Sequence, residues 1–109
     1  MPYHIIEHSD DLASLILMDS TFQGALSSDL FDVKDIKVRA MPFQHYQVGF
    51  ESRSFIHVSL RILSGRSEAR KQILSKSVIE KLSNLNINKV SIIAEVLDID
   101  RDSYQKELT

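Results

Sequence analysis

The sequence contains no cysteine and no tryptophan, and it has only three glycines and two prolines among its 109 residues. Without cysteine the chain can form neither a disulfide framework nor a reactive thiolate, so a reducing compartment is permitted. Glycine is too scarce to build a glycine-rich phosphate-binding loop. No apolar run approaches the length of a membrane span, and the start lacks a basic and then apolar signal pattern. We therefore expect a cytoplasmic protein with no membrane partner.

Positive and negative side chains nearly balance, because the formal net charge is only -2 at pH 7. Proteins that hold nucleic acid through bulk electrostatics need clustered lysine and arginine, so this balance argues against a nucleic-acid partner. The hydrophobic content of 43% and the charged content of 26% are ordinary for a globular protein. The length predicts one domain, residues 1–109, whose small core would benefit from oligomerisation.

The order of predicted elements is strand, helix, strand, repeated in two halves of about 1–50 and 51–100. Strands are predicted over Tyr3–His8, from Ile36 to Ala40 with an extension towards Val48, over Phe55–Leu63 and over Lys89–Leu97. This order predicts an α+β fold: a four-stranded mixed sheet with two helices on one face. A ferredoxin-like domain has the same element order, and the order alone leaves that alternative open.

The two helices differ in how clearly the sequence marks them. The first is predicted over Leu12–Leu30, with Asp19 as the alternative cap of a shorter helix. Its apolar residues at near-helical spacing are Leu15, Phe22, Leu26 and Leu30. The second is predicted from a Ser67 cap to about Leu85. Its buried stripe is predicted to be Leu74, Val78, Leu82 and Leu85.

Few side chains are candidates for chemistry. The histidines at positions 4, 8, 45 and 57 do not have metal-ligand spacing, and we expect no metal site. His4 and His8 are interpreted as structural or exposed, and His57 as a hydrogen-bonded core residue. No nucleophile elbow is present. Taken singly, each histidine is explained by structure more readily than by catalysis.

The remaining candidates are cations. Lys37 and Arg39 lie two residues apart on a predicted strand, so their side chains should share a face. Arg61 lies in the third predicted strand. Arg66 follows Gly65 and precedes a helix N-terminus, where backbone amides and the helix dipole favour anions. An isolated arginine is usually solvated or ion-paired, but this location makes Arg66 a candidate for binding a carboxylate.

Pro2 raises a separate question, because the initiator methionine is commonly removed when the next residue is small. Removal would leave Pro2 as a free secondary amine, whereas retention of Met1 would leave its nitrogen as an amide without basicity. A free α-amino group has a reference pKa of about 8. Apolar surroundings and nearby cations lower that value towards the working range of a general base. Pro2 is therefore either a strand-edge residue or a catalytic group.

The segments MPYHIIEHS, IKVRA, FIHVSLRI and SGRS resemble, in this order, 5-carboxymethyl-2-hydroxymuconate isomerases of the tautomerase superfamily. The resemblance covers the chain from its first residue to about Leu97. It implies a duplicated β-α-β protomer that forms a homotrimer and isomerises an enol or dienol carboxylate without a cofactor. It also implies that Pro2 is the general base and that Arg66, Arg39 and Lys37 bind substrate.

Lys37 departs from this family pattern, because relatives commonly carry arginine there. Lysine keeps the charge but loses the bidentate grip on a carboxylate. The resemblance implies that the substrate is a small dicarboxylate or tricarboxylate enol from the breakdown of aromatic compounds. The alternative function is a non-catalytic module that keeps the fold and binds a small molecule without turning it over.

Overall fold

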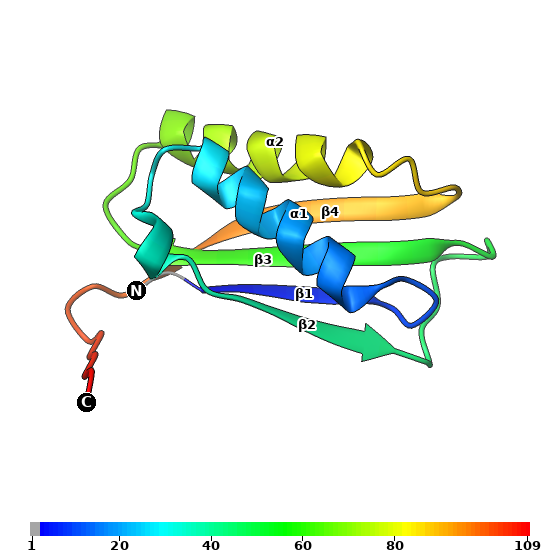
Figure 1. Cartoon of the computed structure of the whole chain (residues 1–109), viewed down its shortest axis with the longest axis horizontal. Coiled ribbons are helices and arrows are strands. Elements are labelled where there is room, and N and C mark those ends of the chain that lie inside the picture. Colours follow the sequence, from blue (N-terminus) through cyan, green and yellow to red (C-terminus); the bar gives the residue numbers. More distant parts are fainter. Residues whose placement is uncertain (1–2) are drawn as a thin grey trace.

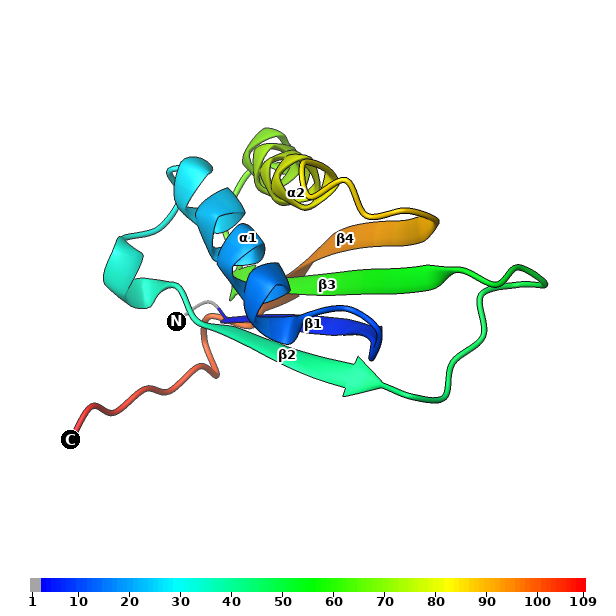
Figure 2. The ribbon, with the colours of Figure 1, turned by 45° about the vertical axis from the view of Figure 1, so that its right-hand side comes forward.

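The computed structural model describes residues 3–109, and Met1 and Pro2 lie outside the described residues. Its elements are β1 (Tyr3–Ser9), α1 (Ser14–Ser27), a short 3-10 helix (Val33–Asp35), β2 (Val38–Phe43), β3 (Ser54–Leu63), α2 (Glu68–Ser83) and β4 (Val90–Ile99). The strands form one sheet in the order β2-β1-β3-β4. Both helices cover the same face of this sheet (Figures 1 and 2). The predicted α+β architecture is confirmed.

The pairing of the strands distinguishes the two topologies that the sequence left open. β1 pairs with β2 in parallel, β3 pairs with β4 in parallel, and β1 and β3 are antiparallel neighbours at the centre. Each helix therefore connects two adjacent strands of its own half. The ferredoxin-like arrangement instead splits its β-α-β units, so it is excluded.

Strand alternation sorts the side chains between the two faces of the sheet. The face under the helices carries the core, which includes the fully buried residues Ile6 on β1 and Ile56, Val58, Leu60 and Ile62 on β3. The opposite face, here called the open face, has no helix over it in the described chain (Figure 2). Several large apolar residues remain exposed along it or beside it, including Met41, Ile93 and Leu97.

The first helix differs from its prediction in length and in the face it buries. It spans Ser14–Ser27, so most of the predicted range from Leu12 to Leu30 is helical, but the helix begins two residues later and ends three residues earlier, and it does not start at Asp19. Leu15 is 79% exposed, and the buried residues are Leu17, Thr21, Gly24 and Ala25. Apart from Leu17 these buried residues are small, and Gly24 lies close to α2. A Cβ atom on Gly24 would lie only 2.7 Å from the Cα atom of Val78.

The second helix agrees more closely with its prediction. Ser67 is the N-cap residue, and its hydroxyl accepts a hydrogen bond of 3.3 Å from the backbone nitrogen of Arg70. Leu74, Val78 and Leu82 are fully buried, as predicted. Leu85 lies two residues beyond the end of the helix at Ser83 and is half-buried.

The second strand ends earlier than predicted, at Phe43, with Pro42 inside it at the edge of the sheet. An edge strand tolerates a proline because one side of it has no ladder to complete. Val48 instead forms an isolated bridge to Glu51 within the connection 44–53. This connection extends beyond the sheet (Figure 2). It includes Phe50, whose side chain is fully exposed.

The burial of the histidines differs from two of the expectations. His4 and His8 are both fully buried under the helices, so the structural interpretation holds and exposure does not. His57 lies on the open face rather than in the core, and its Nε2 atom is 3.0 Å from the Glu95 carboxylate. Among residues 3–109, no helix is both long and apolar enough to span a bilayer.

Candidate functional site

Tyr3 and two arginines form a compact cluster at the end of the open face. The guanidinium carbon of Arg39 lies 5.0 Å from the centre of the Tyr3 ring, and that of Arg61 lies 5.4 Å from it. Both distances are within the range of cation-π attraction. Arg61 Nη1 also donates a hydrogen bond of 2.9 Å to the Tyr3 hydroxyl. The residue that follows Pro2 in the sequence is therefore in contact with two cations.

Strand register explains why these three residues meet. Tyr3 on β1 is paired directly with Arg61 on β3, and Ile5 on β1 is paired with Arg39 on β2. Residues two apart on a strand share a face, so Tyr3, Arg39 and Arg61 all point away from the helices. Arg61 was recognised in the sequence as a strand residue but was not assigned to the site. Only the antiparallel register brings it to Tyr3.

Lys37 lies one residue before β2 and is exposed. Its backbone carbonyl accepts a hydrogen bond of 2.8 Å from the backbone nitrogen of His4, so the pairing with β1 continues through this position. By alternation the Lys37 side chain belongs to the same face as Arg39. Lys37 and Arg39 therefore both lie beside the first residues of β1.

Charge is sorted along the open face. Lys37, Arg39 and Arg61 lie at the end where β1 begins, and no ion pair joins any of them to a carboxylate within residues 3–109. Further along, Glu95 is hydrogen-bonded to His57, and that bond lowers the pKa of the carboxyl group. The cationic end is therefore the part of this face where an anion would be favoured.

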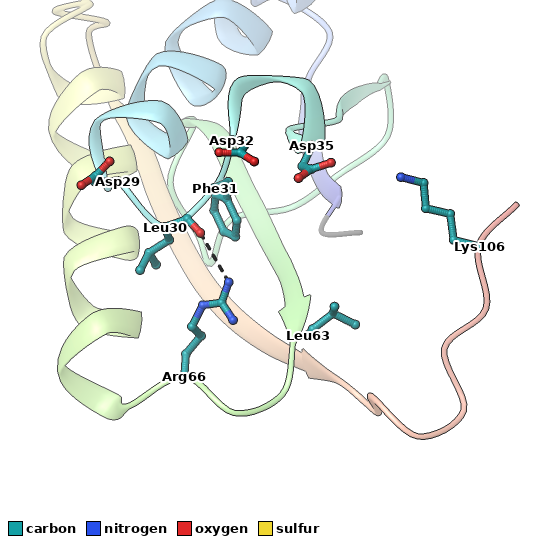
Figure 3. Close-up of a pocket in the computed structure, with 8 residues that line it drawn as sticks. All are labelled: Asp29, Leu30, Phe31, Asp32, Asp35, Leu63, Arg66 and Lys106. Carbon is teal, nitrogen blue, oxygen red and sulfur yellow. Dashed lines mark hydrogen bonds between the residues drawn. The ribbon is translucent and has the colours of Figure 1, made fainter. Parts of the chain in front are cut away.

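Arg66 lies in different surroundings. It borders an open cavity of about 480 Å³ and its Nη2 atom donates a hydrogen bond of 3.4 Å to the carbonyl of Leu30 (Figure 3). Lys106 from the C-terminal segment is a second cation at this cavity. Three carboxylates also line it, namely Asp29, Asp32 and Asp35. The positive charge of Arg66 is thus offset by its neighbours, in contrast to that of Arg39.

His4 and Phe31 connect the two regions. The His4 ring lies 5.8 Å from the ring of Phe31, which lines the Arg66 cavity. Tyr3 and His4 are successive residues of β1 and so point to opposite faces of the sheet. The arginine cluster and the Arg66 cavity therefore lie on the two sides of the same strand end. Pro2, the expected base, immediately precedes this end in the sequence but lies outside the described residues.

Burial also determines the charge state of His4. It lowers the pKa of the imidazole from 6.5 to about 4, and an interaction with the Tyr3 backbone opposes this shift. Neither ring nitrogen has a well-formed hydrogen bond within the described chain. His4 is therefore neutral near pH 7, and it contributes no positive charge to the site. No group of three or more histidine, aspartate or glutamate side chains in residues 3–109 is arranged to hold a metal ion.

Comparison with known proteins places the chain in a family. The family model for 5-carboxymethyl-2-hydroxymuconate isomerase matches residues 2–99. The chain belongs to this family. The resemblance noted in the sequence is thereby confirmed, and membership supports an isomerase or tautomerase function. No individually curated protein matches the sequence significantly.

Solved structures of this isomerase family have the same fold. A 5-carboxymethyl-2-hydroxymuconate delta-isomerase is 20% identical, with a TM-score of 0.79 over 100% of this chain and 89% of its own. The family's isomerase from Deinococcus radiodurans R1 is 22% identical, with a TM-score of 0.79 over 99% of this chain and 90% of its own. A fused 4-OT asymmetric trimer is 12% identical, with a TM-score of 0.81 over 95% and 91%. The tautomerase-like fold is therefore shared across these proteins.

Proposed function

We propose that this protein is a cofactor-independent isomerase that moves a proton within an enol or dienol carboxylate, with Pro2 as the general base. Lys37, Arg39 and Arg66 bind the carboxylates of the substrate. The observation that supports the proposal is the contact of Arg39 with Tyr3, the residue bonded to Pro2, because Arg39 has no ion pair with a carboxylate within residues 3–109. Family membership supplies the reaction class.

The chemistry requires a base that removes a proton next to a carbonyl group and returns it at another carbon. The free secondary amine of an N-terminal proline is such a base, since its reference pKa is already close to neutrality. Cations at the same strand end hold the substrate carboxylate and stabilise the negative charge that develops on the enolate oxygen. Two groups of residues, one transferring the proton and one binding charge, are sufficient for this step.

We further propose that the protein acts as a homotrimer. The open face leaves Met41 and Ile93 exposed, and the connection 44–53 presents the exposed side chain of Phe50. A single small domain gains stability by covering such apolar surface. Trimeric neighbours of the same fold are consistent with this arrangement. A cytoplasmic location and a role in the breakdown of aromatic compounds remain predictions from the sequence and the resemblance.

The test is the replacement of the proposed base. Pro2→Ala should lower kcat for ketonisation of phenylenolpyruvate by about 10²–10⁴-fold, the usual contribution of a positioned base. Pro42→Ala is the matched control, because Pro42 lies in the edge strand β2 and should leave kcat unchanged. The intact mass of each protein reports whether Met1 has been removed.

Two results would contradict the assignment of Pro2 as the base. If the mature protein retains Met1, or if Pro2→Ala is as active as Pro42→Ala, Pro2 is not the base. Binding of the enol without turnover by the unmodified protein would instead favour the non-catalytic module.

A further inference from the structure

Arg61 has no role in the function proposed above, although it contacts Tyr3. It is half-buried in the central strand β3, and no carboxylate in residues 3–109 pairs with it. Its Nε atom is fully buried without a hydrogen-bond partner in the same part of the chain. A buried donor that remains unpaired is destabilising. The Tyr3 hydroxyl holds Nη1, so the side chain has a defined position but an incomplete set of partners.

A cavity lies beside this side chain. It has a volume of about 500 Å³ and is lined by Tyr3, Arg61, Leu97, Asp98, Ile99 and Tyr104. The volume is within the range of sites for small organic ligands. Apolar side chains of β4 form one part of its wall, and the Tyr3 and Arg61 pair forms another. The cavity therefore combines an apolar surface with a guanidinium group.

The carboxylate in the cavity wall does not neutralise Arg61. Asp98 is instead paired with Lys71 of α2, whose Nζ atom lies 2.9 Å from Asp98 Oδ2. This hydrogen bond raises the pKa of Lys71, which indicates that the two charges satisfy each other. Arg39 adds a second cation on the other side of the Tyr3 ring. The balance of charge at Tyr3 is thus positive, unlike that at the Arg66 cavity.

We infer that Arg61, held by Tyr3, is a substrate-binding residue that selects for a second carboxylate. This inference rests on the proposed isomerase function and adds a specificity residue to it. On the dicarboxylate or tricarboxylate that the family resemblance implies, one carboxylate would lie at Arg61 and the reacting part at the start of β1. An arginine suits this task because its planar fork can donate two hydrogen bonds to one carboxylate.

The test compares two substrates that differ in one carboxylate. 2-Hydroxymuconate is a dienol with two carboxylates, and its analogue carries a methyl group in place of the distal one. In Arg61→Gln, KM for the dicarboxylate should rise by about 10–100-fold while kcat changes little, as expected for a lost charged hydrogen bond. KM for the methyl analogue should stay within about twofold, because that contact is absent. Arg70→Gln is the matched control, since Arg70 is an exposed guanidinium on α2.

Equal losses on both substrates, or no loss on either, would overturn the inference. A change in the oligomeric mass of Arg61→Gln in sedimentation would also overturn it, because Arg61 would then serve subunit contacts. Binding of the unreactive dicarboxylate adipate, measured by calorimetry, separates this inference from the proposed reaction. If adipate binding depends on Arg61 while the unmodified protein turns over neither dienol, the isomerase proposal fails and the carboxylate site stands.

Discussion

The burial of His4 predicts a specific dependence of stability on pH. Its ring is fully buried beside Phe31, and neither nitrogen has a well-formed hydrogen bond in residues 3–109. Burial lowers the pKa of the folded state to about 4 from 6.5. Protonating this ring in the folded protein would place an uncompensated charge among apolar groups. The folded state therefore resists a proton that the unfolded chain accepts.

The sign and size of the effect follow from proton linkage. Between pH 6.5 and about 4 the unfolded chain holds a proton on His4 and the folded chain does not. The contribution of His4 to the free energy of unfolding is therefore fully present above the pKa of the unfolded state. It falls as the pH decreases through this window. Because each unit of pKa shift corresponds to about 1.4 kcal/mol, the full loss of stability from His4 is about 3 kcal/mol. At about pH 5 the loss is about 2 kcal/mol.

The variant His4→Phe isolates this contribution from those of other titrating groups. Phenylalanine keeps an aromatic ring next to Phe31 and removes two buried polar atoms that have no hydrogen-bond partner within residues 3–109. Urea unfolding at about pH 7.5 and about pH 5, at one protein concentration, gives the loss of stability for each protein. The unmodified protein should lose about 2 kcal/mol more than His4→Phe. His45→Gln is the control, because His45 is exposed in the connection 44–53.

Equal losses in the unmodified protein and in His4→Phe would refute this reasoning. They would mean that the folded state accepts the proton on His4 as readily as the unfolded chain does. His45→Gln should lose as much stability between the two pH values as the unmodified protein does.

Two further predictions concern the helix contact and the candidate cations. Gly24→Ala should destabilise the protein by about 1–3 kcal/mol in urea unfolding, although alanine is the better helix former, because its Cβ atom would meet the backbone of α2. Gln23→Ala, on the exposed face of α1, should cost less than about 0.5 kcal/mol, and an equal effect at both positions would argue against the close helix contact. Arg39→Gln should raise KM for 2-hydroxymuconate more than Arg66→Gln does, since the charge of Arg66 is offset by three aspartates. The reverse order would show that the acidic cavity is the main carboxylate site.

The sequence was most informative where apolar residues repeat with a clear period. Strand alternation over Phe55–Leu63 and the stripe of Leu74, Val78 and Leu82 predicted β3 and α2 closely. The pattern failed on α1 because that helix packs through Gly24 and Ala25, and small residues carry little hydrophobic signal. Large residues such as Leu15 then suggested a stripe that the fold leaves exposed. Close helix packing requires the partner helix to be known.

The candidate site was only partly predictable for a related reason. Lys37 and Arg39 are neighbours in sequence, so strand periodicity alone predicted their common face. Arg61 reaches Tyr3 from 58 positions away, through the antiparallel register of β1 and β3. Nothing local in the sequence specifies that register. The contribution of Arg61 therefore became visible only when the sheet was assembled.

The arrangement of charge around the start of β1 changes the weight given to each cation. The sequence made Arg66 a candidate for binding a carboxylate because it precedes a helix N-terminus, where an anion is favoured. That argument counts only local groups, and the fold adds Asp29, Asp32 and Asp35 to the same cavity. On the other side of the strand, Arg39 and Arg61 share one aromatic ring and have no opposing carboxylate in the described chain. We therefore propose that the open face contributes more to carboxylate binding than the helix-side cavity, where the three aspartates offset the charge of Arg66.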